Sequence, residues 1–463
     1  MKNFSRNACL VAMMALISAS AANAQTSTFS LSDYKNPSYL YQTLDLNFGL
    51  DNGLTLRRNS TGIERTNNNF SLGFNAGGEY LRNSNSENKQ GDLRISLNSG
   101  INSSSSGYKY KPLTDDSKTK SFTYSERLSI DMSERYYNKK NQYFGIDAAL
   151  NSSLSGYNRN NTTTADTFDY STKSNQTDFR NSIAVSFLFG IGRIEQVQDA
   201  RLAVYLLEDL QKLNKSKRIA TKEEVIELAH LITSLKYKRF FDNRLRKIAE
   251  ITAIDSFMQK KNIAATPDAM YFTSLNDNWN FANNPVRSNG YRLFTGIEAD
   301  LLYNNVKYKH ETLKPENINR ETTNNETIPG LFFIAGINHE KPLTLKWQQS
   351  ANVKGGFGMR QDKFTKDEFE TAIIDTVTKS YMETVPSINF SANYGYGYYP
   401  NSRTWLELDW SLDAGWDKRM AGTTRQDKEN QQNDLYVFTG PRLRAYYYLS
   451  ERIRLTLFLN GEF

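Results

Sequence analysis

The amino-acid sequence predicts an all-β fold, a transmembrane antiparallel β-barrel of about 14 strands (range roughly 12–16) with an α-helical insertion of about 70 residues. Three observations predict this fold. Apolar and polar residues alternate in many runs of about ten residues. The composition is rich in aromatic residues but poor in hydrophobic residues overall. In one segment the apolar residues recur at the spacing of a helix.

The first 24 residues are predicted to be a cleaved signal peptide. Lys2 and Arg6 supply the positive start, residues 9–17 form a short apolar stretch, and residues 22–24 supply the small residues of a cleavage site. The apolar stretch is too short to cross a bilayer as a helix. Cys9 is the only cysteine and lies within this segment, so we expect the exported chain to have no disulfide, no cysteine metal site and no lipid anchor.

The composition also favours a barrel over a soluble domain. Hydrophobic residues make up 38% of the chain and the mean hydropathy is −0.63, yet aromatic residues reach 13%. A barrel wall needs apolar residues at only every second position and uses aromatic residues at both membrane interfaces. The net charge of +7 is a weak bias for 463 residues, so we expect no nucleic-acid partner.

Alternation is the strongest signal for individual strands. In residues 91–103, for example, Leu93, Ile95 and Leu97 alternate with Arg94 and other polar residues. Each run is about as long as a tilted strand that crosses a bilayer. Strands are predicted near 39–50, 53–65, 68–82, 91–103, 121–133, 142–156, 178–190, 289–303, 328–340, 343–358, 381–395, 403–416, 434–449 and 452–463.

The connections are predicted to be of two kinds. Residues 51–53, 340–342, 400–402 and 450–451 are expected to form short turns, and the polar segments 103–120, 157–177, 304–327, 359–380 and 417–433 are expected to form long loops. The domains are then a signal peptide (1–24), a first half-barrel (25–190), a helical insertion (191–267) and a second half-barrel (268–463). A soluble β-sandwich or propeller is the alternative, but its strands would be shorter, and no repeat of propeller length is visible.

Residues 193–262 carry apolar residues at helical spacing and are predicted to hold two or three amphipathic helices. Residues 221–224 fit a capping box, with Thr221 as the N-cap and Glu224 at the third position. A third helix is expected to begin near Asp242. The helices are expected either to form a bundle at one mouth of the barrel or to enter the barrel and narrow it.

Basic residues in the insertion form a candidate patch for an anionic partner, such as lipid or lipopolysaccharide phosphates. The alternative is a solvated face balanced by the acidic residues of the same helices. The candidate patch comprises Lys236, Lys238, Arg239, Arg244, Arg246 and Lys247.

Charged residues at the polar positions of the strands are expected to face the lumen. They either create a transverse field that helps polar solutes pass, or pair with one another and fill the interior. The acidic strand 403–416 is expected to neighbour the basic strand 434–449. The candidate lumen charges are Arg94, Arg127, Asp131, Asp147, Arg180, Arg292, Glu298, Glu407, Asp409, Asp413, Arg442, Arg444 and Arg454.

No residue pattern predicts catalysis. The three histidines, His230, His310 and His339, lie far apart in sequence and show no metal-ligand spacing. No Gly-x-Ser-x-Gly motif or phosphate-binding glycine loop is found in its required context. We therefore predict that the protein is not an enzyme and needs no cofactor or metal.

The chain ends in an alternating strand, residues 452–463, whose last residue is the aromatic Phe463. With the signal peptide and the repeated amphipathic strands, this ending resembles the outer-membrane β-barrel proteins of Gram-negative bacteria as a class, in a tyrosine- and asparagine-rich style similar to that of Bacteroidota. The resemblance implies the cell outer membrane as location, outer-membrane lipid and lipopolysaccharide as surroundings, and the barrel-assembly machinery as a partner during insertion. In that class Phe463 would end in the periplasm, which would place the long loops at 304–327, 359–380 and 417–433 there too, against the usual arrangement.

The predicted function is a porin-like passive channel for small polar solutes or an exported polymer. Barrels of about 14 strands are wide enough for a channel, whereas about eight strands only accommodate side chains. A second hypothesis is a structural or binding barrel whose basic helical insertion docks a periplasmic or other envelope partner. A third is a lipid or peptide hydrolase, which would require a histidine clustered with serine or aspartate at one rim.

Overall fold

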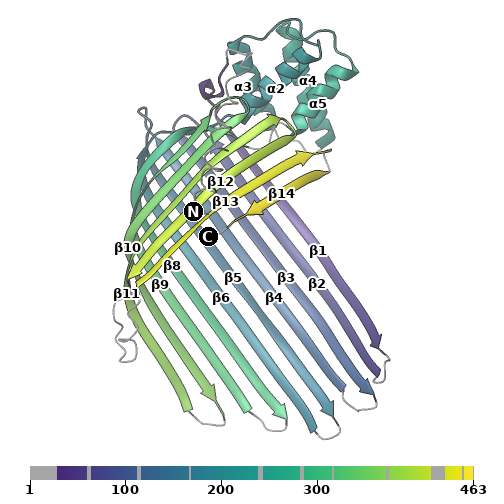
Figure 1. Cartoon of the computed structure of the whole chain (residues 1–463), viewed down its shortest axis with the longest axis vertical. Coiled ribbons are helices and arrows are strands. Elements are labelled where there is room, and N and C mark those ends of the chain that lie inside the picture. The colour runs from purple at the N-terminus through teal and green to yellow at the C-terminus, as the bar shows by residue number, and fades with distance from the viewer. Residues whose placement is uncertain are drawn as a thin grey trace, which may run out of the picture.

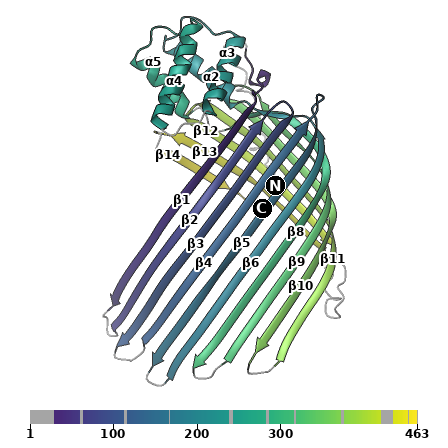
Figure 2. The same cartoon turned by 180° about the vertical axis from the view of Figure 1, so that it is seen from behind.

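A computed structural model describes residues 29–59, 64–111, 116–165, 168–237, 243–281, 286–314, 318–371, 375–418, 433–450 and 453–461. The predicted signal peptide and Phe463 lie outside these ranges. The described residues form one curved antiparallel sheet of 14 strands and a unit of four helices at one end of it (Figures 1 and 2). The predicted fold class is confirmed.

The strands follow one another along the sheet in chain order, and each pairs antiparallel with the next. Six long strands precede the helices: β1 (Tyr39–Asn59), β2 (Glu64–Asn85), β3 (Lys89–Lys111), β4 (Asp116–Tyr137), β5 (Gln142–Ala165) and β6 (Phe168–Ile191). The short β7 (Ile194–Gln196) pairs with the start of β8 and lies off the main path. Seven strands follow the helices: β8 (Ser288–Lys314), β9 (Ile318–Pro342), β10 (Trp347–Glu370), β11 (Asp375–Asn401), β12 (Thr404–Lys418), β13 (Asn433–Tyr448) and β14 (Arg454–Asn460).

The number of strands agrees with the prediction, although the predicted strands 39–50 and 53–65 form the single strand β1 and the short β7 was not predicted. Two of the predicted turns lie within strands. The turn at 51–53 was expected because Asp-Asn-Gly is a strong turn signature. Instead β1 runs straight through it, paired with β2 from Tyr39↔Asn85 to Asn59↔Arg65. The Asp51 carboxylate accepts a hydrogen bond from Asn75 Nδ2 on β2 (2.8 Å), so a residue of the turn signature bonds across the sheet instead of forming a turn. The turn predicted at 340–342 also lies within a strand, because β9 continues to Pro342.

Most of the predicted long loops are strand as well. The segments 103–120, 157–177, 304–327 and 359–380 belong largely to strands that continue without interruption of their pairing, and β8 alone is 27 residues long. Polar residues predominate on both faces of these segments, so they lack the alternation that would identify a half-buried strand. Only the predicted loop 417–433 keeps its place, between β12 and β13, and residues 419–432 lie outside the described ranges.

Each long strand therefore divides into two portions. Nearest the helices, the outer face of the sheet carries large apolar side chains that are exposed; Leu44 is 65% exposed and Phe48 is 73% exposed. This apolar band spans about ten residues per strand, the length needed to cross a bilayer with a tilted strand. Its members include Leu72, Phe74, Leu97, Ile101, Phe122, Ile183, Phe187, Leu293, Ile297, Leu331, Phe333, Phe357, Ile388, Leu408, Leu435 and Leu457.

Beyond the band, eight strands continue as what we call the distal portions: 103–111, 116–121, 156–165, 168–178, 304–314, 318–328, 360–370 and 375–385. Figure 1 shows these long hairpins extending away from the helices. At the end of the sheet nearest the helices, by contrast, the hairpins β2–β3, β4–β5 and β9–β10 turn within a few residues.

The helical unit consists of α2 (Gln198–Lys212), α3 (Lys222–Lys236), α4 (Asn243–Lys260) and α5 (Ala269–Phe281). It contains the main hydrophobic core, in which Leu206 of α2, Leu228 and Ile232 of α3 and Ile254 of α4 are fully buried. Two or three helices were predicted, and α5 was missed. No described helix combines the length and hydropathy needed to cross a membrane.

The predicted capping box at the start of α3 is confirmed. Thr221 Oγ1 accepts from the Glu224 backbone N–H (3.3 Å), and Glu224 Oε2 accepts from the Thr221 backbone N–H (2.9 Å). Arg218 adds two hydrogen bonds to the same carboxylate, at 2.6 and 2.8 Å. These bonds favour the ionised carboxylate, and the Arg218 guanidinium is the main reason that the pKa of Glu224 falls to about 2.

We predict that Glu224→Gln destabilises the helical unit by about 1 kcal/mol at neutral pH. The pKa of Glu224 is lower in the folded state (about 2) than its ordinary value of 4.5, so its stabilisation is present above pH 4.5 and is lost as the pH falls through about 2. Thermal unfolding of the detergent-solubilised protein, followed by circular dichroism at several pH values, measures this. The two proteins should converge at the acid end; a pH-independent difference would contradict the linkage.

Candidate functional site

A cavity of about 1330 Å³ lies on the inner face of the sheet, beneath the helical unit. Its wall comes from the inner-face residues of β2–β6 and β8–β10, and residues of the helical unit, including Gln198, Lys236 and Arg246, line it as well. Five of the candidate lumen charges line it: Arg94, Asp131, Asp147, Arg292 and Glu298. The inner face of the sheet at this end therefore combines charged side chains with apolar ones such as Leu188, Phe294 and Ile334, whereas the outer face is apolar.

Most charges of the cavity wall have a partner of opposite charge. Arg135 makes two hydrogen bonds of 2.7 Å to the Asp147 carboxylate. Glu298 accepts from Lys354 Nζ (2.7 Å) and from Ser186 Oγ (2.8 Å). Because neighbouring pairs are set around a hollow and not packed together, the wall presents local dipoles to any polar solute that enters.

Three further charged residues of the cavity wall have partners of different kinds, one charged and two neutral. Arg94 Nε lies 2.9 Å from Glu79 Oε1, so it too is ion-paired. Arg292 Nη2 donates to the neutral Gln90 Oε1 (2.7 Å), and Asp131 accepts from Ser129 (3.2 Å). Sequence reasoning missed the partners Arg135, Lys354 and Gln90. Arg135 follows the predicted end of its strand at residue 133, whereas Lys354 stands at a polar position between Val353 and Gly355 and could have been found by alternation.

The remaining candidates lie elsewhere on the inner face. Arg127 and Arg180 are both paired in register with Ser153, which places them in one row. The predicted neighbours β12 and β13 do pair: Arg444 Nη2 lies 3.1 Å from Glu407 and 2.9 Å from Asp409. Register alignment places the last three charges on this same face: Asp413 opposite Phe438, Arg442 opposite Asp409, and Arg454 opposite Tyr448.

The inner face also holds an apolar cluster that the sequence did not reveal. Leu188, Phe332 and Ile334 are buried there, with Phe294 packed against them. We had assigned apolar positions to the lipid-facing side, but Leu331-Phe332-Phe333-Ile334 is apolar on both faces, so alternation gives no direction. The Arg360 guanidinium lies 5.0 Å from the Phe332 ring and continues this cluster into the charged wall.

The candidate basic patch is not a continuous exposed surface. Lys236 is largely buried, pairs with Asp199 and lines the cavity, and Arg246 lies 2.8 Å from Glu250 within α4. Lys247 is half-buried in α4, Arg244 lies in the first turn of α4, and Lys238 and Arg239 lie outside the described residues. The physical reason is pairing: acidic residues of the same unit neutralise Lys236 and Arg246 and hold them toward the barrel.

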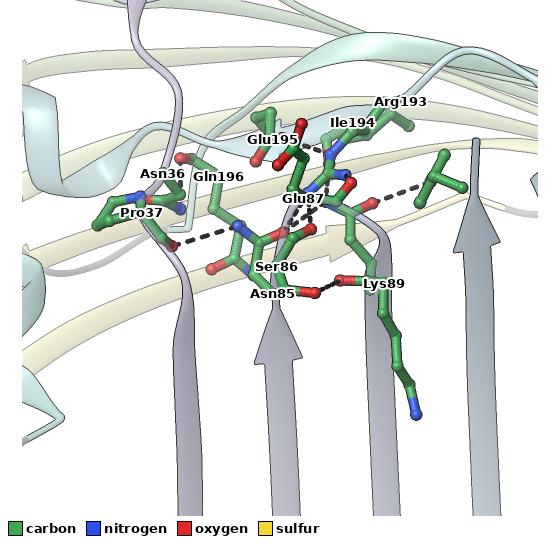
Figure 3. Close-up of polar contacts among 12 residues, drawn as sticks. Asn36, Pro37, Asn85, Ser86, Glu87, Lys89, Arg193, Ile194, Glu195 and Gln196 are labelled. Atoms are coloured by element: carbon green, nitrogen blue, oxygen red, sulfur yellow. Dashed lines mark hydrogen bonds and ion pairs between the residues drawn. The ribbon is translucent and has the colours of Figure 1, made fainter. Parts of the chain in front are cut away.

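Arg193 fixes the helical unit to the rim of the sheet, as Figure 3 shows. Its guanidinium donates to the carbonyls of Ser86 and Glu87 (both 2.7 Å) and to Asn85 Oδ1 (2.8 Å), all in the turn between β2 and β3. The same group donates to Glu195 Oε1 (2.5 Å). One side chain thus ties the entrance of the helical unit to a hairpin more than 100 residues earlier.

Arg287 forms a second anchor where the chain leaves the helical unit. It donates to the backbone carbonyls of Thr344 (2.8 Å), Leu345 and Trp347 (2.7 Å), in the turn between β9 and β10. Arg287 is almost fully buried, and burial lowers its pKa to about 10, which leaves the guanidinium charged at neutral pH. On the same side, Arg403 in the β11–β12 turn pairs with Asp277 of α5.

A third attachment is the N-terminal strap, residues 29–38, which precedes β1. Phe29, Leu31 and Tyr34 are buried in the core of the helical unit. The Tyr34 hydroxyl bonds Thr233 of α3 (3.1 Å), and Asn36 Nδ2 donates to the Gln196 carbonyl (2.9 Å). The helical unit is therefore fastened to the sheet at several points around the rim.

The histidines do not form a metal site. His230 Nε2 lies 3.3 Å from the Lys35 carbonyl, His339 pairs in register with Ala351, and His310 Nδ1 lies 2.8 Å from Ser174 Oγ in the distal portions. Across the described residues, no group of three or more His, Cys, Asp and Glu side chains is placed to hold a metal ion.

No protein-family model and no curated protein matches the chain. Among solved structures, the chain is similar to the translocator domain of the autotransporter NalP from Neisseria meningitidis, with 9% sequence identity, a TM-score of 0.26, and coverage of 97% of this chain and 98% of that chain. It is also similar to the β domain of the Bordetella autotransporter BrkA, with 8% identity, a TM-score of 0.21, and coverage of 81% and 92%. These similarities concern the fold and assign no activity to this chain.

Proposed function

We propose that the protein is an outer-membrane β-barrel that passes small polar solutes passively, with the helical unit narrowing one mouth. The observation that carries the proposal is the contrast between the two faces of the sheet. An exposed apolar band about ten residues tall covers the outer face, and a charged cavity of about 1330 Å³ lies on the inner face. Only a lipid surrounding makes that outer face favourable, and only water makes that inner face favourable.

We further infer that the helical unit faces the periplasm. Outer-membrane barrels have short turns on the periplasmic side and longer extensions outside the cell. The hairpins at the helical end turn within a few residues, whereas the distal portions extend each strand by about ten polar residues at the other end. In this arrangement the distal portions project from the cell surface, in contact with lipopolysaccharide.

A second candidate function is an envelope docking site on the helical unit. Several of its apolar side chains are exposed, among them Ile248 at 58%, Met270 at 54% and Phe272 at 41%. Exposed apolar residues on a soluble unit are a feature of protein interfaces. A periplasmic partner bound there would use the barrel as an anchor and need no conduction.

Single-channel recording in a planar bilayer separates the two candidates. The purified protein should produce steady conductance steps if the cavity belongs to a continuous aqueous path. Silence in protein that migrates as a folded barrel on gels would overturn the channel proposal and favour docking.

We predict that Glu298→Gln shifts selectivity toward anions, because it removes the carboxylate that neutralises Lys354 in the cavity wall. The ratio of cation to anion permeability should fall by roughly twofold. Glu311→Gln is the matched control, since Glu311 lies on the same strand, pairs with Lys309 (2.7 Å), and stands on the outer face. Reversal potentials in a salt gradient measure both; equal shifts would contradict a lumen role for Glu298.

A further inference from the structure

Aromatic side chains in the distal portions are concentrated on the inner face. Residues an even number of positions apart on a strand share a face, and so do residues paired directly across strands. Asp147, Glu298 and Lys354 line the cavity and therefore mark the inner face. By this rule Tyr157 shares the face of Asp147, Tyr308 shares that of Glu298, and Phe364 shares that of Lys354. The inner-face aromatic residues with described side chains are Tyr108, Tyr157, Tyr170, Tyr308, Phe364 and Tyr381.

The outer face of the same portions has a different composition. Within these ranges Phe369 is the single aromatic residue with a described side chain on this face, and other outer-face residues include Lys307, Lys309 and Glu311. Further aromatic residues stand on the outer face at the border of the apolar band, namely Phe122, Tyr124, Phe179 and Tyr303. Beyond this border the rings are concentrated on the inner face, which cross-strand packing alone does not explain, because it would stabilise the sheet equally well from either face.

Two pairs of inner-face rings are stacked, and two further tyrosine rings on this face are exposed. The rings of Phe364 and Tyr381 are directly paired and stacked, with centroids 5.3 Å apart. The rings of Tyr308 and His310 are nearly parallel, at 6° and 6.3 Å. Tyr108 is 45% exposed and Tyr170 is 36% exposed, so these two side chains are not buried in a hydrophobic core.

Hydroxyl and amide groups surround the rings on the same face. Ser104 Oγ bonds Ser121 Oγ (2.6 Å), Thr119 Oγ1 donates to Asn161 Oδ1 (3.0 Å), and Ser174 Oγ bonds His310 Nδ1 (2.8 Å). Register pairing places Ser104, Ser121, Arg159, Ser174 and His310 in one continuous row across β3–β8. Such groups both donate and accept hydrogen bonds, so they suit a ligand whose edges carry hydroxyls.

Inner-face charges in the distal portions include two ion pairs, and Arg159 on the same face lies over the Tyr157 ring at 5.7 Å. Arg320 lies 2.7 Å from Glu370, and Lys366 lies 2.5 Å from Glu368. Ligands of high charge would have to compete with these pairs. Aromatic ring faces, hydroxyl and amide partners and these ion pairs together describe chemistry complementary to an uncharged sugar.

We propose that the inner face of the distal portions binds an uncharged oligosaccharide, whose pyranose rings stack on the aromatic residues while its hydroxyls bond the serine, threonine and asparagine side chains. The inference rests on the proposed function in one respect: the sugar reaches this face by entering the lumen. It adds the solute class, and it places recognition outside the apolar band, ahead of the charged cavity.

Calorimetric titration of the detergent-solubilised full-length protein with neutral hexasaccharides of glucose and of N-acetylglucosamine tests the proposal. A sulfated hexasaccharide is the charged comparison. At least one neutral hexamer should bind at millimolar concentration or below. Tyr308→Ala and Phe364→Ala should each weaken it by about threefold to tenfold, the range expected for losing one aromatic contact.

Phe369→Ala is the matched control, because it removes a phenylalanine from the same strand, five positions along and on the outer face, and should leave binding unchanged. Tyr308→Phe keeps the ring and should retain most of the affinity, and gel mobility reports whether each variant remains folded. The proposal is overturned if no neutral hexamer binds, if the sulfated sugar binds more tightly, or if Phe369→Ala weakens binding as much as Phe364→Ala. If the protein bound a neutral hexamer but gave no conductance steps in bilayers, the channel proposal would be refuted and the sugar-binding proposal would stand.

Discussion

Removing the four helices is expected to raise the single-channel conductance by roughly twofold or more, because residues of the helical unit line the charged cavity and would restrict a path through it. The deletion would join Val197 to Val286 through a short glycine–serine linker. The structure favours this junction, since the Val197 backbone N–H donates to the Arg287 carbonyl at 2.8 Å and the two ends already meet. Residues 29–34 should be shortened in the same variant because their apolar side chains would lose the core that covers them.

The barrel itself should assemble without the helices. Its strands pair with neighbours along the sheet from β1 to β14, and β6 pairs directly with β8 across the insertion point. Heat-modifiable migration on gels is the control for assembly. Conductance that is unchanged in an assembled deletion variant would show that the path bypasses the helical unit, and loss of heat-modifiable migration would show that the helices are needed for folding.

Arg287→Ala is expected to cost about 2–4 kcal/mol in the attachment of the helical unit, since it leaves buried backbone carbonyls in the β9–β10 turn without a donor. Arg193→Ala should have a similar effect at the β2–β3 turn, where the guanidinium serves two carbonyls and one amide oxygen. Hydrogen exchange of residues 198–281 and of the two turns measures the loss. We expect faster exchange there and unchanged exchange in β3–β5.

Lys212→Ala is the matched control for these anchors. Lys212 is also a cation of the helical unit with an acidic partner, Asp209 at 3.0 Å, but its side chain is 69% exposed and its partner lies one turn away on the same helix. Exposed ion pairs contribute little, about 0–1 kcal/mol. If the two arginine variants exchanged no faster than Lys212→Ala, the helical unit would not depend on these anchors.

Alternation in the sequence predicted the strand portions that form the apolar band. It did not predict the distal portions, in which both faces are mainly polar. Alternation identified residues 142–156 of β5 because Ile146 and Leu150 face outward between polar residues. The same strand continues to Ala165 through Asn160 and Thr162, where no face is apolar and the pattern disappears. Hydrogen bonding between strands, which leaves no trace in a single strand's composition, holds these portions together.

The helical unit shows the same dependence on tertiary structure. α3 was predicted from its capping box, a local signal, and begins where expected. α5 was missed because its asparagine- and aromatic-rich sequence has low helix propensity. Tyr271, Leu275 and Trp279 are nevertheless buried at four-residue spacing, and that periodicity was the available signal.

At the candidate site, the direction of the charged side chains could be predicted and their partners only in part. Alternation placed Glu298 and Asp147 on the inner face, and strand order predicted that Arg444 would meet acidic residues of β12. The pairing of Arg135 with Asp147 could not be predicted, because the alternation of apolar and polar residues ended that strand at residue 133, before Arg135. Lys236 was assigned to an exposed patch because its partner Asp199 lies on another helix, 37 residues away in the sequence.

The N-terminal strap makes the maturation of this protein depend on a segment that is synthesised much later. Tyr34 and Thr233 are 199 residues apart in sequence, and β1 to β6 lie between them. Because the strap precedes α2–α5 in the chain, its buried side chains have no core to enter until those helices have been synthesised and folded. We therefore expect the strap to dock late in folding, when it joins the start of β1 to the finished helical unit.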